Sequence, residues 1–268
     1  MRAQKTTLLF FLFAFLMANG MYGGELEETF DKTFPLEKGQ HFSLKNTNGS
    51  VRLYGWDRQE VRIEAIKRVK AASRSQAERI MQQLEIQIER TDAGIFVDTI
   101  VPISLRHGFL SWLFDGFSSH GVEVKYTIWL PNDVLSEVRT VNGSIFINEL
   151  RGDINVRTTN GRIRVESASG SVKANTTNGS VNVELVEVEP GSEIRMRTTN
   201  GSVKLYLPKD FAGEIKARTT NGSITTDFPI EVMGQLNRRR LEGRIGEGGD
   251  VLCDIATTNG SVKILQIE

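Results

Sequence analysis

Four arginines are the side chains of this sequence whose type and spacing could do chemistry. Each stands directly before a threonine of a recurring motif: Arg139, Arg157, Arg197 and Arg218. Asn175 takes the same place in another copy. Like charges that stack on neighbouring strands repel one another unless acidic neighbours or an anionic ligand offset them. The pattern indicates either a binding strip for an anionic polymer or a solvated face held by ion pairs, and the solvated face is the default interpretation.

Catalytic chemistry is not indicated. The three histidines, His41, His107 and His120, are scattered, and no His/Cys/Asp/Glu spacing typical of a metal site occurs. The paired carboxylates of most glycosidases are missing, because glutamates such as Glu166 and Glu184 are isolated. The 33 basic and 33 acidic residues cancel, which argues against a nucleic-acid partner. We expect no enzyme, no cofactor and no metal.

The elements that must position the arginines follow from the motif Thr-Thr-Asn-Gly-Ser-Val and its close variants. Glycines from Gly143 to Gly179 lie nine residues apart, with Asn-Gly on every second one, so the unit is eighteen residues with two corners. Later copies are further apart, and we assign the extra residues to loops at the corners. The corner pairs are Asn48 and Gly49, Asn142 and Gly143, Asn160 and Gly161, Asn178 and Gly179, Asn200 and Gly201, Asn221 and Gly222, and Asn259 and Gly260.

Between the corners, apolar and polar residues alternate strictly. The apolar residues Ile154 and Val156 occupy even positions, and the polar residues Asn155 and Arg157 occupy the odd positions between them. A period of two is typical of strands with one buried and one solvated face. An all-β protein with two packed layers satisfies this pattern. Cys253 occupies an apolar position of its own strand, so we expect an inert thiol in the core.

Two architectures fit a corner every nine residues. A meander would use each Asn-Gly pair as a type I′ hairpin turn with positive φ. A β-solenoid, similar to a single-stranded β-helix with two strands per coil of about 18–22 residues, would stack each corner on the next one along the chain. Amides and hydroxyls could then form hydrogen-bonded ladders along the axis. The solenoid is favoured, because only stacked corners gain hydrogen bonds from having the same residues at the same place in every coil. We expect positive φ at a corner glycine such as Gly179.

The first twenty residues have the pattern of a secretory signal peptide. Arg2 and Lys5 precede an apolar run over residues 8–18, and small residues lead to a cut near Met21. The run is about eleven residues, whereas a membrane-spanning helix needs roughly twenty. We therefore expect an exported protein, periplasmic or secreted and associated with the cell surface. No transmembrane helix is expected after signal removal.

The mature chain divides near residue 131 into two parts that we expect to be continuous. Residues 21–131 form a β-rich part with one short helix, for which Ser75 and Glu78 make a capping box. Strands are expected over residues 84–89, 95–101 and 122–130. Residues 132–268 form the solenoid of repeats.

An aromatic insertion over residues 103–120 is the most apolar part of the mature chain. It contains Phe109, Trp112, Phe114 and Phe117. An exposed cluster of this kind would be a contact surface for a membrane or a partner. A loop that covers an open solenoid end is the favoured interpretation, because terminal repeats must be protected and aromatic clusters pack more often than they bind.

Three features together resemble one known family. They are the signal peptide, the early segment Thr47-Asn-Gly-Ser-Val-Arg-Leu-Tyr-Gly-Trp-Asp-Arg, and the repeats followed by Asp227-Phe-Pro-Ile and Gly243-Arg-Ile-Gly-Glu-Gly-Gly-Asp before the last Thr-Thr-Asn-Gly-Ser-Val. The sequence is similar to the bacterial putative-adhesin family, a domain of unknown function with TxNG β-strand repeats in cell-envelope proteins. The resemblance covers nearly all the mature chain. It implies a β-solenoid at the bacterial envelope or beyond it, without known catalysis.

The function that we expect is a non-catalytic exported envelope protein, in which a rigid β-solenoid is an adhesin-like binding or structural module. Its partner would be an envelope component: a glycan, a lipid headgroup or a protein. The alternative is a carbohydrate-active enzyme on a β-helix scaffold, which would need catalytic groups that converge from neighbouring coils.

Overall fold

The computed structural model describes residues 24–101, 121–247 and 249–267. The expected signal peptide over residues 1–20 lies outside the described residues. So do Phe109, Trp112, Phe114 and Phe117 of the aromatic insertion.

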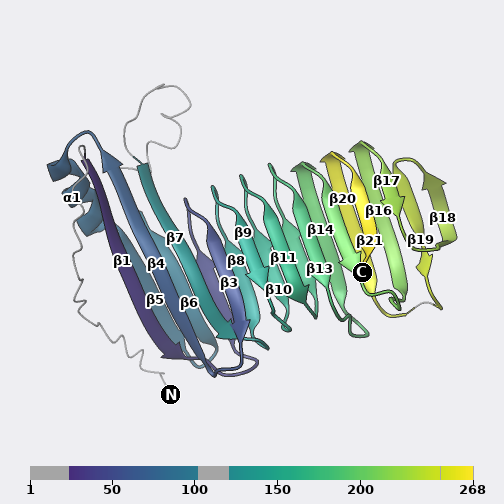
Figure 1. Ribbon diagram of the computed structural model, residues 1–268, viewed down its shortest axis with the longest axis horizontal. Helices are drawn as coiled ribbons and strands as arrows, with labels where there is room; N and C mark the ends of the chain where they lie inside the picture. Colours follow the sequence, from purple (N-terminus) through teal and green to yellow (C-terminus); the bar gives the residue numbers. More distant parts are fainter. Residues whose placement is uncertain (1–23, 102–120, 248, 268) are drawn as a thin grey trace, which may run out of the picture.

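The described chain is all-β with one helix, as the sequence predicts, and its strands form two large sheets (Figure 1). The first sheet has the order β1 (Gly24–Pro35), β4 (Glu60–Ala71), β7 (Gly121–Pro131), β3 (Val51–Trp56), β9 (Ile145–Asn148), β11 (Ile163–Ala168), β13 (Val181–Leu185), β15 (Val203–Leu207), β21 (Val262–Gln266) and β17 (Ile224–Thr226). The second has the order β18 (Glu231–Asn237), β19 (Arg240–Ile245), β16 (Gly213–Asn221), β20 (Leu252–Asn259), β14 (Glu193–Asn200), β12 (Val172–Asn175), β10 (Ile154–Arg157), β8 (Leu135–Arg139), β2 (His41–Lys45), β6 (Gly94–Ile100) and β5 (Glu85–Thr91).

Strands from β8 to β15 alternate between the sheets, so each strand pairs with the next but one along the chain. The pairing is parallel, and Ile154 lies opposite Ser136 on one side and Val172 on the other. Hairpins would pair neighbouring strands antiparallel, which excludes the meander for this region. We call the stack of strands β2, β3, β8–β17, β20 and β21 the two-sheet array.

The end of the two-sheet array does not follow chain order. Strand β20 lies between β14 and β16, and β21 lies between β15 and β17. The prediction that each corner stacks on the next one along the chain is therefore correct up to Asn200 and wrong beyond it. The hairpin of β18 and β19 pairs antiparallel with the outer edge of β16, which leaves only its inner edge for β20.

The core lies between the two sheets and receives every second side chain from each. Val156 of the second sheet and Ile163 of the first are fully buried, and Cys253 is buried as its place in the alternation predicts. The apolar rows run along the stack without interruption from β4 to β21. Burial of this apolar surface is the main force that holds the sheets together.

The single helix, α1 (Arg74–Gln83), packs on β1 and β4 at the amino-terminal end and buries Ala77, Ile80 and Met81. Its N-cap is Ser73, whose hydroxyl accepts a hydrogen bond from the Gln76 amide at 3.3 Å. The predicted cap at Ser75 is wrong, because the backbone is extended at Ser73 and already helical at Ser75.

Candidate anion-binding groove

The corners are joined along the stack by two rows of hydrogen bonds. In five repeats the first threonine is buried and its hydroxyl donates to the glycine carbonyl of the neighbouring coil, as from Thr198 to Gly179 at 2.8 Å. Thr140 donates instead to the Thr47 carbonyl at 3.4 Å. The asparagine amides form the second row, in which Asn178 Nδ2 donates to Asn160 Oδ1 at 2.7 Å. The same amide bond repeats at 2.7–2.8 Å through the order Asn48, Asn142, Asn160, Asn178, Asn200, Asn259 and Asn221. We call this row the asparagine ladder.

Close approach between coils explains the corner glycines. A Cβ on Gly161 would lie 2.5 Å from the carbonyl carbon of Gly143 and closer still to its oxygen, whereas real Cβ atoms essentially never come under 3.0 Å. The prediction of positive φ holds clearly at Gly49, with 122°. It also holds at Gly179, where φ is 155°, whereas Gly161 has no positive φ. The stacking distance therefore requires glycine even where the backbone angle does not.

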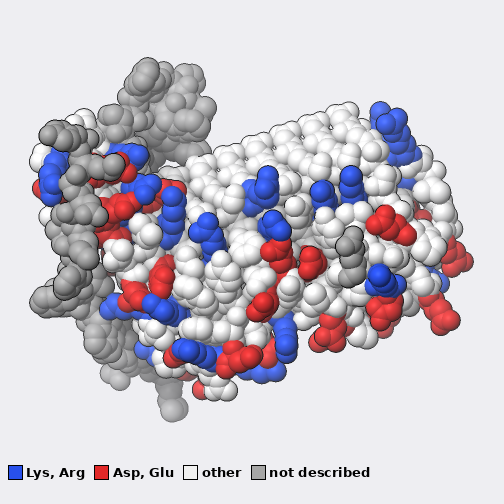
Figure 2. All heavy atoms as spheres, in the orientation of Figure 1, with Lys and Arg blue, Asp and Glu red and all other residues white. Residues whose placement is uncertain are grey.

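The predicted arginines lie in one exposed row on the outer face of the second sheet. The register places Arg157 beside Arg139 on one side and Asn175 on the other. Across the sheet the row contains Lys45, Arg139, Arg157, Asn175, Arg197, Ala256, Arg218 and Arg240, and the acidic Asp98 of β6 lies beside Lys45. Figure 2 draws one face of the molecule, on which lysine and arginine side chains are interspersed with aspartate and glutamate beside an uncharged band.

The inserted strand β20 sets the spacing of this row. Because Ala256 separates Arg197 from Arg218, and Asn175 separates Arg157 from Arg197, the three arginines occupy every second strand. Neighbouring strands are about 4.8 Å apart, so the arginine backbones repeat about every 9.6 Å.

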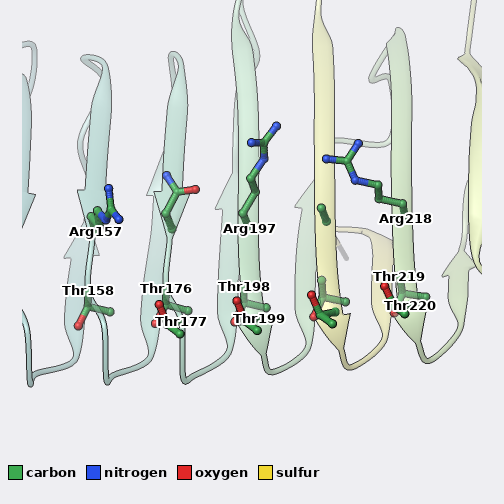
Figure 3. A pocket seen from close by; sticks show the side chains of 14 residues that line it. Arg157, Thr158, Thr176, Thr177, Arg197, Thr198, Thr199, Arg218, Thr219 and Thr220 are labelled. Carbon is green, nitrogen blue, oxygen red and sulfur yellow. The ribbon is translucent and has the colours of Figure 1, made fainter.

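A groove of 540 Å³ runs across these strands. Figure 3 shows Arg157, Arg197 and Arg218 in one row, with the threonine pairs in a second row nearer the corner. Arg139 is not part of the lining, so the structure brings together three of the four predicted arginines in the groove. The other lining residues are Thr158, Asn175, Thr176, Thr177, Thr198, Thr199, Thr219, Thr220, Ala256, Thr257 and Thr258.

Ion pairs neutralise part of the arginine row. Arg139 contacts Glu137, and Arg197 Nη2 lies 2.6 Å from Asp254 Oδ2. Arg157 and Arg218 have no acidic partner among the described residues. The groove therefore carries an uncompensated positive charge at each end and a paired one in its middle.

A denser ion-pair network lies beside the groove on the same face. Lys173 Nζ lies 2.7 Å from Glu193 Oε2, and this hydrogen-bonded lysine lowers the pKa of the Glu193 carboxyl. Arg195 also contacts Glu193. Arg195 Nε also lies 3.8 Å from Asp254 Oδ2, the same carboxylate oxygen that contacts Arg197. Glu193 and Asp254 thus contact Lys173, Arg195 and Arg197, and neither contacts Arg157 or Arg218.

Sequence reasoning missed three charged residues that belong to the arginine row or pair with it, although none of them lines the groove. Lys45 stands before the first motif as Arg139 stands before Thr140, so the repeat alignment could have found it. Arg240 comes from an antiparallel strand outside the repeat, and the sequence carries no signal for it. The pairing of Asp254 with Arg197 depends on the insertion of β20.

A second feature missed by sequence reasoning is an aromatic cluster on the outer face of the first sheet. The Tyr54 and Trp129 rings stack with centroids 6.0 Å apart, and Phe146 meets Tyr54 edge-on at 5.8 Å. The Arg62 guanidinium lies 5.6 Å from the Trp129 ring centroid. The rings of this cluster therefore contact one another and a neighbouring guanidinium within the protein, as aromatic side chains do in other cross-strand pairs.

Two further observations concern the described residues only. No group of three or more His, Cys, Asp or Glu there could hold a metal ion. No helix in this part of the chain has the length and apolarity to cross a membrane.

The comparisons with known proteins agree with the sequence motifs. Residues 118–237 match the model of a domain of unknown function, DUF7330. No curated protein matches the chain. A putative cell adhesion protein from Clostridium sporogenes is 14% identical, with a TM-score of 0.51 over 89% of this chain and 100% of that one.

Two other solved structures are more distant. A putative adhesin from Bacteroides fragilis is 9% identical, with a TM-score of 0.31 over 89% of this chain and 97% of that one. A putative lipid binding protein from Parabacteroides distasonis is 13% identical, with a TM-score of 0.28 over 90% of this chain and 97% of that one. The chain is thus similar to putative adhesins of unknown function, which confirms the resemblance drawn from its repeats.

Proposed function

We propose that the chain is a non-catalytic, exported protein of the bacterial envelope whose two-sheet array is a rigid β-solenoid that binds an anionic polymer along the groove. The observation that carries the proposal is the pair of arginines without acidic partners, Arg157 and Arg218, at the two ends of one threonine-lined groove. Exposed cations of this kind attract carboxylates and phosphates.

A polymer fits the groove better than a small anion does. The lining repeats from coil to coil, and exposed threonines such as Thr177 and Thr199 offer a hydroxyl beside each strand. A chain with acidic groups about 9.6 Å apart, two strand spacings, would meet Arg157, Arg197 and Arg218 in succession. A single anion would meet only one of them.

Rigidity supports the same proposal. The asparagine ladder and the buried threonine hydroxyls fix each coil against its neighbours. The arginine backbones are therefore held at their spacing before a ligand arrives, which lowers the entropy lost on binding.

Titration of the purified protein with polyanions tests the proposal. The probes are hyaluronan, polygalacturonate and vesicles of phosphatidylglycerol, with dextran as the neutral control. We expect binding to an acidic polymer that weakens steeply between low and physiological salt. The triple variant R157Q/R197Q/R218Q should lose about 100-fold in affinity, from roughly 1 kcal/mol for each charge.

A matched variant controls for net charge. Arg52, Lys204 and Lys263 lie on the outer face of the first sheet, with no ion-pair partner among the described residues. The variant R52Q/K204Q/K263Q removes the same charge and should keep most of the affinity. Equal losses in the two variants, or a wild type without salt-sensitive binding to any of the three polyanions, would overturn the proposal.

Export is tested separately. N-terminal sequencing of the protein from its native cells should find a chain that begins near Met21, because a short apolar run after a basic start is typical of a cleaved signal peptide. A retained Met1 in a membrane fraction would contradict export by cleavage.

A further inference from the structure

The asparagine ladder has one open end, at Asn221 and Gly222. In the other six Asn-Gly corners the glycine amide donates to the asparagine carbonyl of the neighbouring coil, as from Gly179 to Asn200 at 3.0 Å. The remaining donors are Gly49, Gly143, Gly161, Gly201 and Gly260, at 2.9–3.0 Å. The Gly222 amide has no hydrogen-bond partner among the described residues.

The Asn221 side chain is also held from one side only. Its Nδ2 donates to Asn259 Oδ1 at 2.8 Å, whereas its own Oδ1 accepts no hydrogen bond from the described residues. Each of the six remaining carboxamides of the ladder both donates and accepts a hydrogen bond. The difference arises because Asn221 lies in the last coil of the two-sheet array, with no further corner beyond it.

An asparagine followed by glycine can lose its side-chain amide without an enzyme. The glycine backbone nitrogen attacks the asparagine Cγ, ammonia leaves, and a five-membered succinimide forms. Water then opens this ring to aspartate or isoaspartate. The attack requires a glycine nitrogen that is free of its hydrogen bond and a carboxamide that can rotate, so a corner with both groups bonded resists the reaction.

Local opening also favours the last coil. Strand β17 has three residues, lies at the edge of the first sheet, and keeps Ile224 only half-buried. An edge element with few buried contacts opens at a lower free energy than a central one. Asn178, in contrast, lies between two stacked coils and can rotate only if the array separates there.

We propose that Asn221 is a site of spontaneous deamidation and that stacking protects the six other Asn-Gly corners. The product places a carboxylate on β16, the strand that carries Arg218. Isoaspartate also lengthens the backbone by one carbon at the position that pairs with Asn259. The proposal does not depend on what the groove binds.

Mass spectrometry of the intact and digested chain tests the assignment, and the seven corners control one another. The purified full-length protein is incubated at mildly alkaline pH, and the gain of about one dalton is followed in each Asn-Gly peptide. We expect Asn221 to react at least tenfold faster than Asn142, Asn160, Asn178 and Asn200. In urea, where the ladder is absent, all seven should react at similar rates.

Two outcomes would overturn the proposal. One is deamidation of a central asparagine such as Asn178 at the rate of Asn221 in the folded protein. The other is an Asn221 that stays intact in the folded protein while the unfolded chain reacts there. The first would show that stacking does not protect, and the second that the last coil is as protected as the rest.

Discussion

Replacing Gly161 with alanine should destabilise the folded protein by about 3 kcal/mol. The new methyl group would lie 2.5 Å from the carbonyl carbon of Gly143 and 2.9 Å from the Ser144 nitrogen, all backbone atoms of the adjacent coil. Because Gly161 has no positive φ, alanine fits the local backbone. The loss of stability therefore arises from the close approach of the two coils and not from strain in the local backbone.

The magnitude follows from the movement that the methyl group requires. Ordinary Cβ contacts begin at 3.4 Å, so the two coils must separate locally by about 1 Å. Overpacking of this kind costs about 1–3 kcal/mol. The separation also stretches the bond from Thr158 Oγ1 to Gly143 O at 2.9 Å and the bond from Asn160 Nδ2 to Asn142 Oδ1 at 2.7 Å, each worth about 0.5–1.5 kcal/mol.

Thermal and urea unfolding followed by circular dichroism measure the loss. For a chain of this size, about 3 kcal/mol corresponds to a fall in Tm of about 6–12 °C. Gly121→Ala is the matched control, because its Cβ meets no described residue closer than 3.8 Å and its φ is not positive. Gly222→Ala should cost less than Gly161→Ala, since the last coil can move outward. A Tm for Gly161→Ala within 2 °C of the wild type would refute the reasoning.

Three further outcomes are expected. Asp254→Asn removes the acidic partner of Arg197 and should raise the affinity for an acidic polymer about fivefold in the same titration, from roughly 1 kcal/mol of released attraction; unchanged or weaker binding would contradict the groove. Asn178→Ala breaks two amide bonds of the ladder and should lower the free energy of unfolding by about 1–3 kcal/mol in urea; a loss under about 0.5 kcal/mol would show that the ladder contributes little. Burial raises the pKa of the Cys253 thiol, so at pH 8 it should react with a disulfide reagent only as fast as the protein unfolds; rapid reaction of the folded protein would place the thiol at the surface.

Local pattern was enough to predict most of the elements. The strands β5, β6 and β7 lie within a few residues of their predicted positions, because period-two burial fixes which face each side chain takes. The helix cap was misplaced by two residues, since Ser73 with Gln76 fits the same capping pattern as Ser75 with Glu78.

The reason for the corner glycines could not be derived from local rules. An Asn-Gly pair predicts positive φ because that is what a hairpin turn needs. Gly161 is instead required by the backbone of Gly143, which is eighteen residues away in the chain and in contact only after the coils stack. The sequence marked the right positions, and only the packing supplied the physical cause.

By itself, the sequence determined the strands, the two faces of each strand and the corner residues, because these depend on the order of side chains within one repeat. It also determined that Arg157, Arg197 and Arg218 share one position of the repeat. Which coil lies beside which was decided by the tertiary structure. All coils present the same asparagine, glycine and threonine groups, so their stacking edges are nearly interchangeable; the hairpin of β18 and β19, by covering the outer edge of β16, directs β20 inside. That insertion places Ala256 between two arginines and sets the charge spacing of the groove.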